Sequence, residues 1–353
     1  MKSSLLTLLL ALAPLAEMRA ITASDFISKA EQWMSSLDEA ERKAAYRSWL
    51  QMGPEVMAEY EKSLVKVKTF HSKQLTRLAS TSGRESNPYL VHEEIASELD
   101  AERERVLPLI RTDWKKDGKK IKMLREEMED LFELWERANR IARKDTSKLD
   151  AQLDSHLAAL SEISREMERF DEEAYTTDLD DDELREYLLD ENLSAGRIIR
   201  ARTRLLKTRN EIERLEETSQ TNKNLGAWCT GAMQGFTETL NAERVVLGLK
   251  PLVIEEKLSV AAEGHSDDMA KLGFFSHESP VPGKKTPWDR ARKAEFQGSA
   301  NGENIFMGST SPQAAYNAWF ASDGHRLIMM NGGPNVIGVG ISGKHWTMMT
   351  GNL

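Results

Sequence analysis

Two histidines and one glutamate in the last third of the chain, His277, Glu303 and His325, have the residue types of a metal or acid–base site. Imidazole nitrogens and carboxylate oxygens are ligands of Zn²⁺ and similar ions, and the same groups transfer protons in general acid–base catalysis. Each lies at a junction between predicted elements, in "GFFSHESP", "NGENIF" and "SDGHRLIM". Functional side chains gather at such junctions, so we predict that the three meet in one cleft. A hydrogen-bonded cluster that binds no metal is the alternative.

The segment around Glu303 is predicted to be a tight turn that aims this side chain into the cleft. Gly302 would let the backbone turn without a Cβ clash, and Asn304 would satisfy nearby backbone groups through its amide. Ile305 and Phe306 would anchor the segment in the core. Glu303 would then be held by the fold instead of being solvated.

The elements that must position these residues predict an α+β domain. Thr286–Pro287 and Ser311–Pro312 each predict the start of a short helix, because Ser or Thr caps a helix and Pro fits its first position. Two apolar, β-prone stretches on either side of Gly343 predict a β-hairpin. The predicted helices are residues 227–247, 254–272, 286–294 and 311–322, and the predicted strands are residues 335–342 and 345–350. Helices followed by a small sheet favour an α+β sandwich.

The composition of the chain changes near residue 220. Of the 21 glycines, 17 lie in residues 221–353, where the charged residues are balanced at 12 of each sign. The net charge of −9 therefore belongs to residues 1–220, whose low glycine and high charge content is typical of helices. We predict a charged helical bundle or coiled coil over residues 21–220, a polar linker at "EETSQTNKN" (216–224), and a turn-rich domain over residues 221–353.

Heptad patterning supports the helical prediction. Apolar residues recur at spacings of four and three along two seams, each of which would bury a stripe against another helix. The first seam is Leu124, Met128, Leu131, Trp135 and Ala138, and the second is Leu149, Leu153, His156, Leu160, Ile163, Met167 and Phe170. The break "RKDTSK" between the seams predicts an antiparallel helical hairpin, and the seams could also join copies of the chain into a homo-oligomer. Further predicted helices are residues 25–78, 92–113 and 180–215.

Two features of the helical part invite a metal interpretation that the sequence does not support. His156 lies on a seam with no second ligand type nearby, so we interpret it as a paired or half-exposed histidine. The acidic run "DLDDDEL" (178–184) begins like a calcium loop, but Glu183 and Leu189 stand where such a loop requires Gly and Glu. We interpret this run as the solvated start of a helix.

The first 20 residues have the features of a secretory signal peptide. Lys2 precedes a short apolar run, and cleavage is expected after the small residue Ala20. No later stretch approaches the length of a membrane span, so we expect no transmembrane segment in the mature chain and a secreted location, extracellular or periplasmic. Cys229, the single cysteine, excludes an internal disulfide, and we interpret it as a small buried hydrophobic residue. The acidic charge argues against a nucleic-acid partner.

An ordered series of motifs resembles the bacterial branch of the CAP superfamily. This SCP-like family includes the cysteine-rich secretory proteins, insect venom antigen 5 and the plant pathogenesis-related proteins. The motifs are "LNAERVVLGLKPLVIEEKLSVAAEGHSDDMAKLGFFSHESP", "TPWDRARKA", "GENIFMG", "AWFASDGHRLIMM" and "VIGVGISGKHWT". The resemblance covers about residues 230–350, roughly a third of the chain, and not residues 21–220. It implies an α–β–α sandwich whose central cleft is lined by two His and two Glu and often binds a divalent metal.

Matched by motif, the resemblance places His277, Glu303 and His325 in that cleft. The second Glu of the family falls near Ser322 or Asp323, neither of which is Glu, so this chain departs from the full set of four. Many bacterial members carry Tyr and Gln in the last strand, where this chain has His345 and Met348.

Four further residues are predicted to support the cleft. His265 is expected to be a packed, hydrogen-bonded histidine on a helix. Asn304 directly follows Glu303, and Ser322 stands near the position of the family's second Glu. His345 could reach the cleft only if its face of the strand points inward.

Three functions are left as hypotheses. The first, which we favour, is a secreted, non-enzymatic protein on a helical stalk, whose cleft binds a small apolar ligand, or a protein or cell-surface partner, with or without Zn²⁺ or another divalent metal. The second is a metal-dependent hydrolase in which Glu303 or a metal-bound water is the base. The chain has no HExxH, nucleophile elbow or recognisable Ser-His-Asp set. The third is a structural cell-surface coiled coil.

Overall fold

The computed structural model describes residues 87–115, 117–159 and 181–353, together with residues 62, 66, 69–71, 73 and 74, and it gives the backbone alone for residues 181–197. The predicted signal peptide, most of the predicted helix 25–78 and the second seam from Leu160 onward lie outside these residues. The chain divides into two compact units, one of which comprises residues 91–144 and 203–353.

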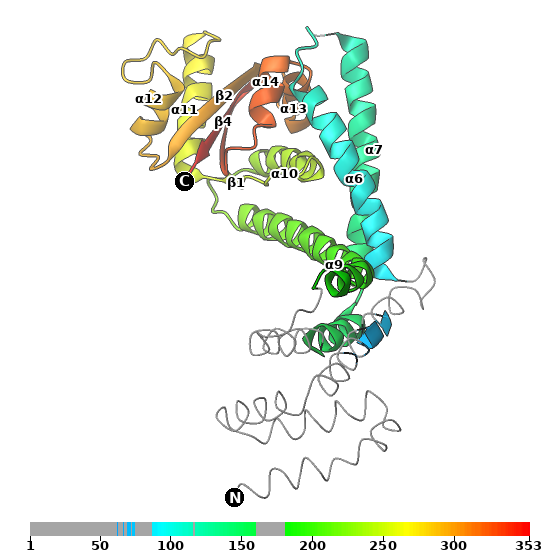
Figure 1. Ribbon diagram of the computed structural model, residues 1–353. Coiled ribbons are helices and arrows are strands. Elements are labelled where there is room, and N and C mark those ends of the chain that lie inside the picture. The colour runs from blue at the N-terminus through cyan, green and yellow to red at the C-terminus, as the bar shows by residue number, and fades with distance from the viewer. Residues whose placement is uncertain are drawn as a thin grey trace, which may run out of the picture. The chain divides into compact units, whose positions relative to one another are not determined.

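The order of elements alternates helices with a few strands (Figure 1). The elements before the first strand are α6 (Pro88–Arg111), α7 (Gly118–Ala142), α9 (Asp181–Lys223) and α10 (Gly231–Val246). They are followed by β1 (Val253–Ile254), α11 (Glu256–Leu272), α12 (Pro287–Lys293), β2 (Ser299–Met307), α13 (Pro312–Phe320), α14 (Asp323–Met329), β3 (Val336–Ser342) and β4 (His345–Asn352). Among the described residues, no helix is both long enough and apolar enough to cross a membrane.

The strands form one sheet in the order β1-β3-β4-β2, which leaves β2 at an edge. The β1–β3 pair is parallel, and β3–β4 and β4–β2 are antiparallel. Helices α11 and α12 cover one face of the sheet, and α10, α13 and α14 cover the other (Figure 1). The predicted α–β–α sandwich and its β3–β4 hairpin are therefore confirmed.

Helix-capping residues place the two short helices as predicted. The Thr286 hydroxyl accepts from the Asp289 backbone N–H at 3.2 Å, and the Asp289 carboxylate accepts from the Thr286 N–H at 3.0 Å. This reciprocal cap starts α12 with Pro287 in its first turn. The Ser311 hydroxyl caps α13 by accepting from the Ala314 N–H, without a reciprocal bond.

The segment predicted as a tight turn is instead the edge strand β2, so that prediction is wrong. Gly302 lies beside a register shift in the β2–β4 pairing. A Cβ at Gly302 would stand 2.9 Å from Cγ2 of Ile328 on α14. The glycine therefore leaves room for the Ile328 side chain of the helix packed on this strand, and it does not serve a turn.

Two predicted boundaries also differ from the structure. The helix predicted over residues 311–322 ends at Phe320 as α13, and a separate helix, α14, begins at Asp323. The predicted linker at residues 216–224 is helical through Lys223. Its polar residues have structural partners, since the Asn222 side chain accepts from the Ile254 N–H at 2.8 Å and donates to the Leu252 carbonyl at 3.2 Å.

Strand β3 is built for close contact with α11. A Cβ at Gly338 would stand 2.3 Å from the Leu258 carbonyl carbon, and one at Gly340 would stand 1.9 Å from the Glu263 nitrogen. Helix backbone therefore lies directly on strand backbone. The neighbouring core on this face includes Ala262 and Met349.

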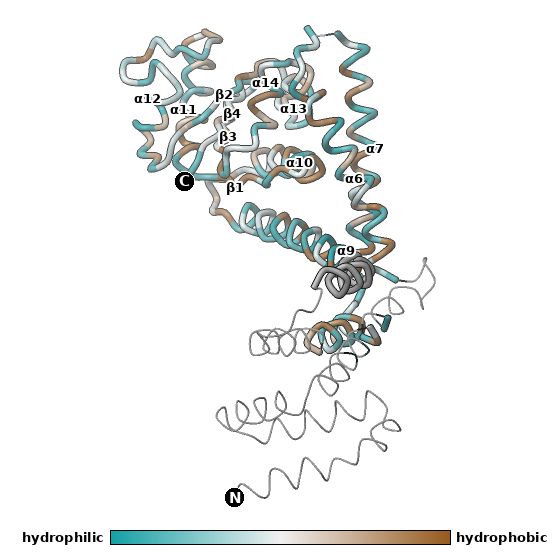
Figure 2. Tube along the Cα trace, in the orientation of Figure 1, coloured by the Kyte–Doolittle hydropathy of each residue, from teal (hydrophilic) through white to brown (hydrophobic). Residues whose placement is uncertain are grey.

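The other face of the sheet holds an aromatic core. Phe236 of α10 meets Trp319 of α13 edge-on, with ring centroids 5.3 Å apart, and also contacts Tyr316 and Trp346. All four side chains are buried. In Figure 2, α10 carries more brown than α9, which is largely teal.

Helix α6 is attached to this domain by buried arginines. Arg326 of α14 donates to the carbonyls of Ile110 at 2.8 Å and Thr112 at 3.0 Å. Arg103 of α6 donates to the carbonyls of Val245 and Val246 at the end of α10. The compact unit therefore joins residues 91–144 to the C-terminal domain, whereas composition had suggested a division at residue 220.

The seam predictions fit the described residues. Every residue of the first seam is buried in α7. On the second seam Leu153 is buried, and His156 is half-buried with its Nδ1 3.2 Å from Nδ1 of His71. This confirms the interpretation of His156 as a paired histidine.

We expect Gly340→Ala to lower the free energy of unfolding by about 3 kcal/mol, because the added methyl group forces α11 away from β3. The matched control is Gly235→Ala in α10, where a Cβ meets nothing within 4 Å. That substitution should raise stability by about 0.8 kcal/mol through helix propensity. Urea titrations of the full chain measure both changes, and equal stability of the two variants would contradict the packing argument.

Candidate functional site

The structure brings two of the three predicted cleft residues into direct contact. His277, in the loop after α11, has its Nδ1 2.9 Å from Oε1 of Glu303 on β2. The Glu303 side chain is 2% exposed, whereas the His277 ring is 51% exposed. A carboxylate accepts hydrogen bonds, so Nδ1 of His277 is the donor and the other ring nitrogen, Nε2, is left as an acceptor in the neutral ring.

A buried arginine holds the other side of Glu303. Arg290 of α12 forms an ion pair with Oε2 of Glu303, and its own side chain is 1% exposed. The same guanidinium donates to the His277 carbonyl at 3.2 Å, and to the carbonyls of Lys284 and Lys285 at 3.0 and 3.3 Å. Arg290 therefore joins the strand, the short helix and the loop that carries His277.

Sequence reasoning missed Arg290. The signal available to it was the position of this arginine on the same helical face as Ala291 and Ala294, which pack toward the core. A charged residue on an apolar helix face needs a buried partner of opposite charge. Glu303 is that partner, and only the packing of α12 against β2 reveals the pair.

His265 of α11 lies behind the site and is completely buried. Its Nε2 is 2.9 Å from the Ser276 carbonyl, so this nitrogen carries the proton and supports the loop next to His277. Burial lowers the pKa of His265 below its usual value, the Glu303 carboxylate opposes that effect, and the Arg290 charge adds to it. His265 is therefore a neutral, supporting group.

Alternation along β2 separates His325 from the pair. Successive strand residues point to opposite faces, so Glu303 faces α11 and α12 while Asn304 faces α14. The Asn304 amide was expected to bond its own neighbourhood, but it donates to the His325 carbonyl at 2.9 Å. His325 and Ser322 instead line a pocket of about 430 Å³ beside the edge strand.

His345 shares the face of the sheet that holds Glu303, but not its position. In the register of β2 with β4, Glu303 opposes Met349 and Met307 opposes His345. Four residues along a strand span roughly 13 Å. His345 therefore lies near the far end of the strand from the Glu303 carboxylate.

The residues of this cluster do not fit a metal held by Glu303. Its two oxygens accept from His277 and Arg290, and the arginine places a positive charge where a cation would have to stand. Within the part of the chain that the structure describes, no group of three or more His, Cys, Asp or Glu could hold a metal ion. What the arrangement offers is an imidazole oriented by a carboxylate from behind.

Comparison with known proteins identifies the domain that carries this site. Residues 237–347 match the model of the cysteine-rich secretory protein family, CAP, and therefore form a CAP domain. The uncharacterized protein YkwD of Bacillus subtilis (strain 168) is 41% identical over 112 residues, which is 31% of this chain and 43% of the relative. The uncharacterized membrane protein YlbC of the same organism is 34% identical over 118 residues, 33% of this chain and 34% of the relative. The chain thus spans less than half the length of these relatives, both bacterial as predicted.

Solved structures also resemble part of this chain. One is the 1.5 Å crystal structure of an extracellular protein containing a SCP domain from Bacillus anthracis str. Ames, 31% identical, covering 35% of this chain and 41% of that chain, with a TM-score of 0.34. Another is an outer surface protein from Borrelia burgdorferi, 20% identical, covering 34% of this chain and 92% of that chain, with a TM-score of 0.30.

We expect Arg290→Met to lower the free energy of unfolding by about 3 kcal/mol, because it leaves the buried Glu303 charge without its ion-pair partner. Adding Glu303→Leu should restore part of that loss, since no charge then remains buried. Arg292→Met changes a side chain that is 78% exposed and should have little effect. Denaturant titration of the full-length variants gives these values. A double variant less stable than Arg290→Met would refute the pairing.

Acidification should destabilise the domain in part through His265. Its pKa is lowered in the folded state, so the unfolded chain takes up the proton first as the pH falls below about 6.5. Stability from this group is complete above that pH and is lost on going down toward the lower folded pKa. We expect His265→Gln, which can still donate to the Ser276 carbonyl, to show a weaker loss of stability between pH 7 and 5. His345→Gln is the control, and identical pH slopes for wild type and His265→Gln would contradict the prediction.

Proposed function

We propose that the CAP domain is a binding module that recognises its ligand through the Nε2 atom of His277. The observation that carries this proposal is the ordered series Arg290, Glu303, His277, whose side chains are 1%, 2% and 51% exposed. Two buried charges thus support one accessible imidazole. Such support lowers the cost of orienting the ring when a ligand binds.

The proposed ligand has a hydrogen-bond donor and an apolar part. In the neutral tautomer that Glu303 selects, the outer nitrogen of His277 accepts a hydrogen bond. The apolar part would enter the 430 Å³ pocket, whose lining includes Phe275, Phe306 and Met307. Phe275 is 47% exposed and lies two residues before His277, so one loop borders both surfaces. A hydroxyl-bearing small molecule, or an exposed partner side chain of that chemistry, has this combination.

A binding role accounts for the site better than hydrolysis does. A hydrolase without a metal would need a nucleophile within hydrogen-bond reach of His277. Among the described contacts the His277 ring bonds Glu303, and none joins it to a Ser, Thr or Cys side chain. The charge of Arg290 beside Glu303 also disfavours a metal-bound water at that carboxylate.

The helical region serves in this proposal to carry and brace the domain. Arg125 of α7 forms an ion pair with Glu243 of α10 at 3.1 Å, and its guanidinium lies 3.6 Å from the centre of the Phe320 ring. These contacts favour a helical region that packs directly on the domain, next to its buried aromatic side chains. The compact grouping of residues 91–144 with the domain supports the same view.

A pair of probes tests the recognition mode. We expect p-cresol, which has an O–H donor and a ring for the pocket, to bind the full chain about tenfold more tightly than its methyl ether, 4-methylanisole. His277→Phe should abolish the difference, because it removes the acceptor and keeps an aromatic ring. Binding is followed by ¹H–¹⁵N chemical-shift titration, in which the indole N–H of Trp319 provides a reporter next to the pocket.

Three results bear on the proposal. His345→Phe removes a different half-buried histidine and should leave the preference for p-cresol unchanged. Equal affinity of the two probes for the wild type would reject His277 as the acceptor. Absence of any shift up to about 10 mM of either probe would reject the pocket itself.

A further inference from the structure

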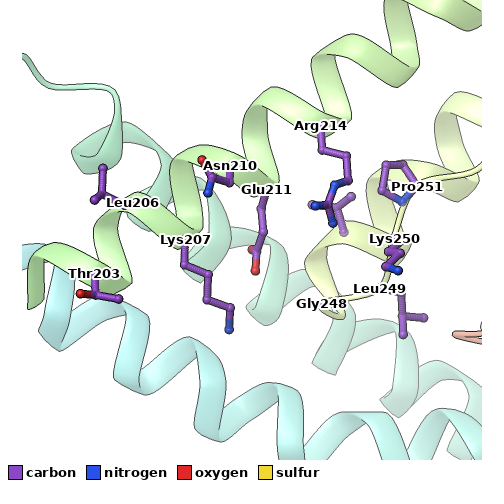
Figure 3. A pocket seen from close by; sticks show the side chains of 11 residues that line it. Thr203, Leu206, Lys207, Asn210, Glu211, Arg214, Gly248, Leu249, Lys250 and Pro251 are labelled. Atoms are coloured by element: carbon purple, nitrogen blue, oxygen red, sulfur yellow. The ribbon is translucent and has the colours of Figure 1, made fainter. Parts of the chain in front are cut away.

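A second pocket, of about 510 Å³, lies between α9 and the loop that connects α10 to β1 (Figure 3). Its walls come from two segments that are distant in sequence. Helix α9 contributes Thr203, Leu206, Lys207, Asn210, Glu211 and Arg214, and the α10 end with its loop contributes Val245, Gly248, Leu249, Lys250 and Pro251. Neither the residues of the His277 site nor those of the 430 Å³ pocket line this one.

Three cations of this pocket have no acidic partner among the described residues. They are Lys207 and Arg214 on α9 and Lys250 on the loop. Nearby cations are paired, as Arg204 is with Glu93 at 3.3 Å and Lys223 is with Glu238 at 3.1 Å. The chain as a whole carries a net charge of −9, so acidic residues are plentiful, and yet none of those that the structure describes forms an ion pair with these three.

The one acidic residue in the pocket is already engaged. Glu211 forms an ion pair with Arg103 of α6 at 3.2 Å. Arg103 also donates to the carbonyls of Val245 and Val246 at 2.9 and 2.8 Å. The charge of Glu211 is therefore already neutralised by Arg103, and the remaining charged residues that line the pocket are all positive.

The same contacts make the pocket wall rigid. Gly248 takes a φ of 75°, which lets the chain leave α10 in a tight turn, and the Arg103 stem packs 3.6 Å from where its Cβ would be. The Leu249 N–H then bonds the Arg244 carbonyl at 2.8 Å. Leu249 and Lys250 are thus presented from a fixed loop, which reduces the entropy lost on binding.

Apolar surface completes the pocket. Leu206 is 41% exposed on α9, and Leu249 and Pro251 line the pocket from the loop. Figure 3 shows Arg214 directed toward the loop that carries Lys250 and Pro251, with Lys207 further along α9. Arg214 and Lys250 supply positive charge where α9 meets the loop, and Leu249 and Pro251 lie next to them. This combination is complementary to a molecule that has both an acidic head and a short apolar body.

We propose that this pocket binds a small amphiphilic anion. Arg214 and Lys250 hold its carboxylate or phosphate head, Leu206 and Leu249 contact its aliphatic part, and Lys207 adds to the attraction. The volume is within the usual range for small-molecule sites. This ligand is distinct from the uncharged donor proposed for His277, and either proposal can fail without the other.

The test uses hexyl phosphate, hexanoate, inorganic phosphate and 1-hexanol with the full-length protein in calorimetric titrations at low salt. We expect hexyl phosphate or hexanoate to bind at least about tenfold more tightly than phosphate or hexanol alone, because only the amphiphiles use both parts of the pocket. The stronger of the two amphiphiles identifies the preferred head. Raising the salt concentration should weaken binding.

The decisive variant is Arg214→Gln with Lys250→Gln, which should weaken the preferred amphiphile about tenfold or more. Both residues are exposed, and neither forms an ion pair with an acidic group in the described part of the chain, so the fold should be retained, and circular dichroism checks this. Lys271→Gln with Arg292→Gln removes the same charge from α11 and α12, where the side chains are 71% and 78% exposed, and should leave binding unchanged. Equal weakening in both variants would indicate general charge attraction and reject the pocket. Absence of binding to wild type up to about 10 mM would reject it as well.

Discussion

The buried ion pair between Arg290 and Glu303 is the interaction on which the rest of the site depends. Two charges with side chains only 1% and 2% exposed can remain in the interior because each neutralises the other. Arg290 also bonds three loop carbonyls, so the pair fixes the path of the segment between α11 and α12. The orientation of His277 is a consequence, since its ring meets the remaining oxygen of Glu303. One ion pair thus fixes the position of α12, the path of the loop before it and the orientation of the His277 ring.

The close contact between α11 and the sheet provides the frame for that pair. Because Gly338 and Gly340 have no side chains, the α11 backbone lies against β3, and His265 is carried into the interior beside the loop. Because successive side chains of β2 point to opposite faces of the sheet, neighbouring residues make different contacts. Glu303 forms an ion pair with Arg290 of α12 on one face, and Asn304 donates to the His325 carbonyl of α14 on the other. The edge strand therefore links two faces that have different chemistry.

Arginine-to-carbonyl contacts recur where separate parts of the chain meet. Arg326 binds the end of α6 to α14, and Arg103 binds α6 to the end of α10. Arg244 donates to the carbonyls of Met329 and Asn331, and burial lowers its pKa to about 10. Each guanidinium satisfies carbonyls at the end of an element, where the backbone has no partner of its own. The helices outside the CAP domain thus become part of its structure.

The sequence by itself determined the local elements and the type of domain. Thr286 and Ser311 predicted helix starts, the glycine-separated apolar stretches predicted the β3–β4 hairpin, and the ordered motifs predicted a CAP domain, because each signal depends on residues near one another in the chain. Only the tertiary structure decided which groups meet. It supplied Arg290 as the partner of Glu303, put Gly302 in a strand, and joined residues 91–144 to the domain, because these outcomes depend on packing between segments distant in sequence.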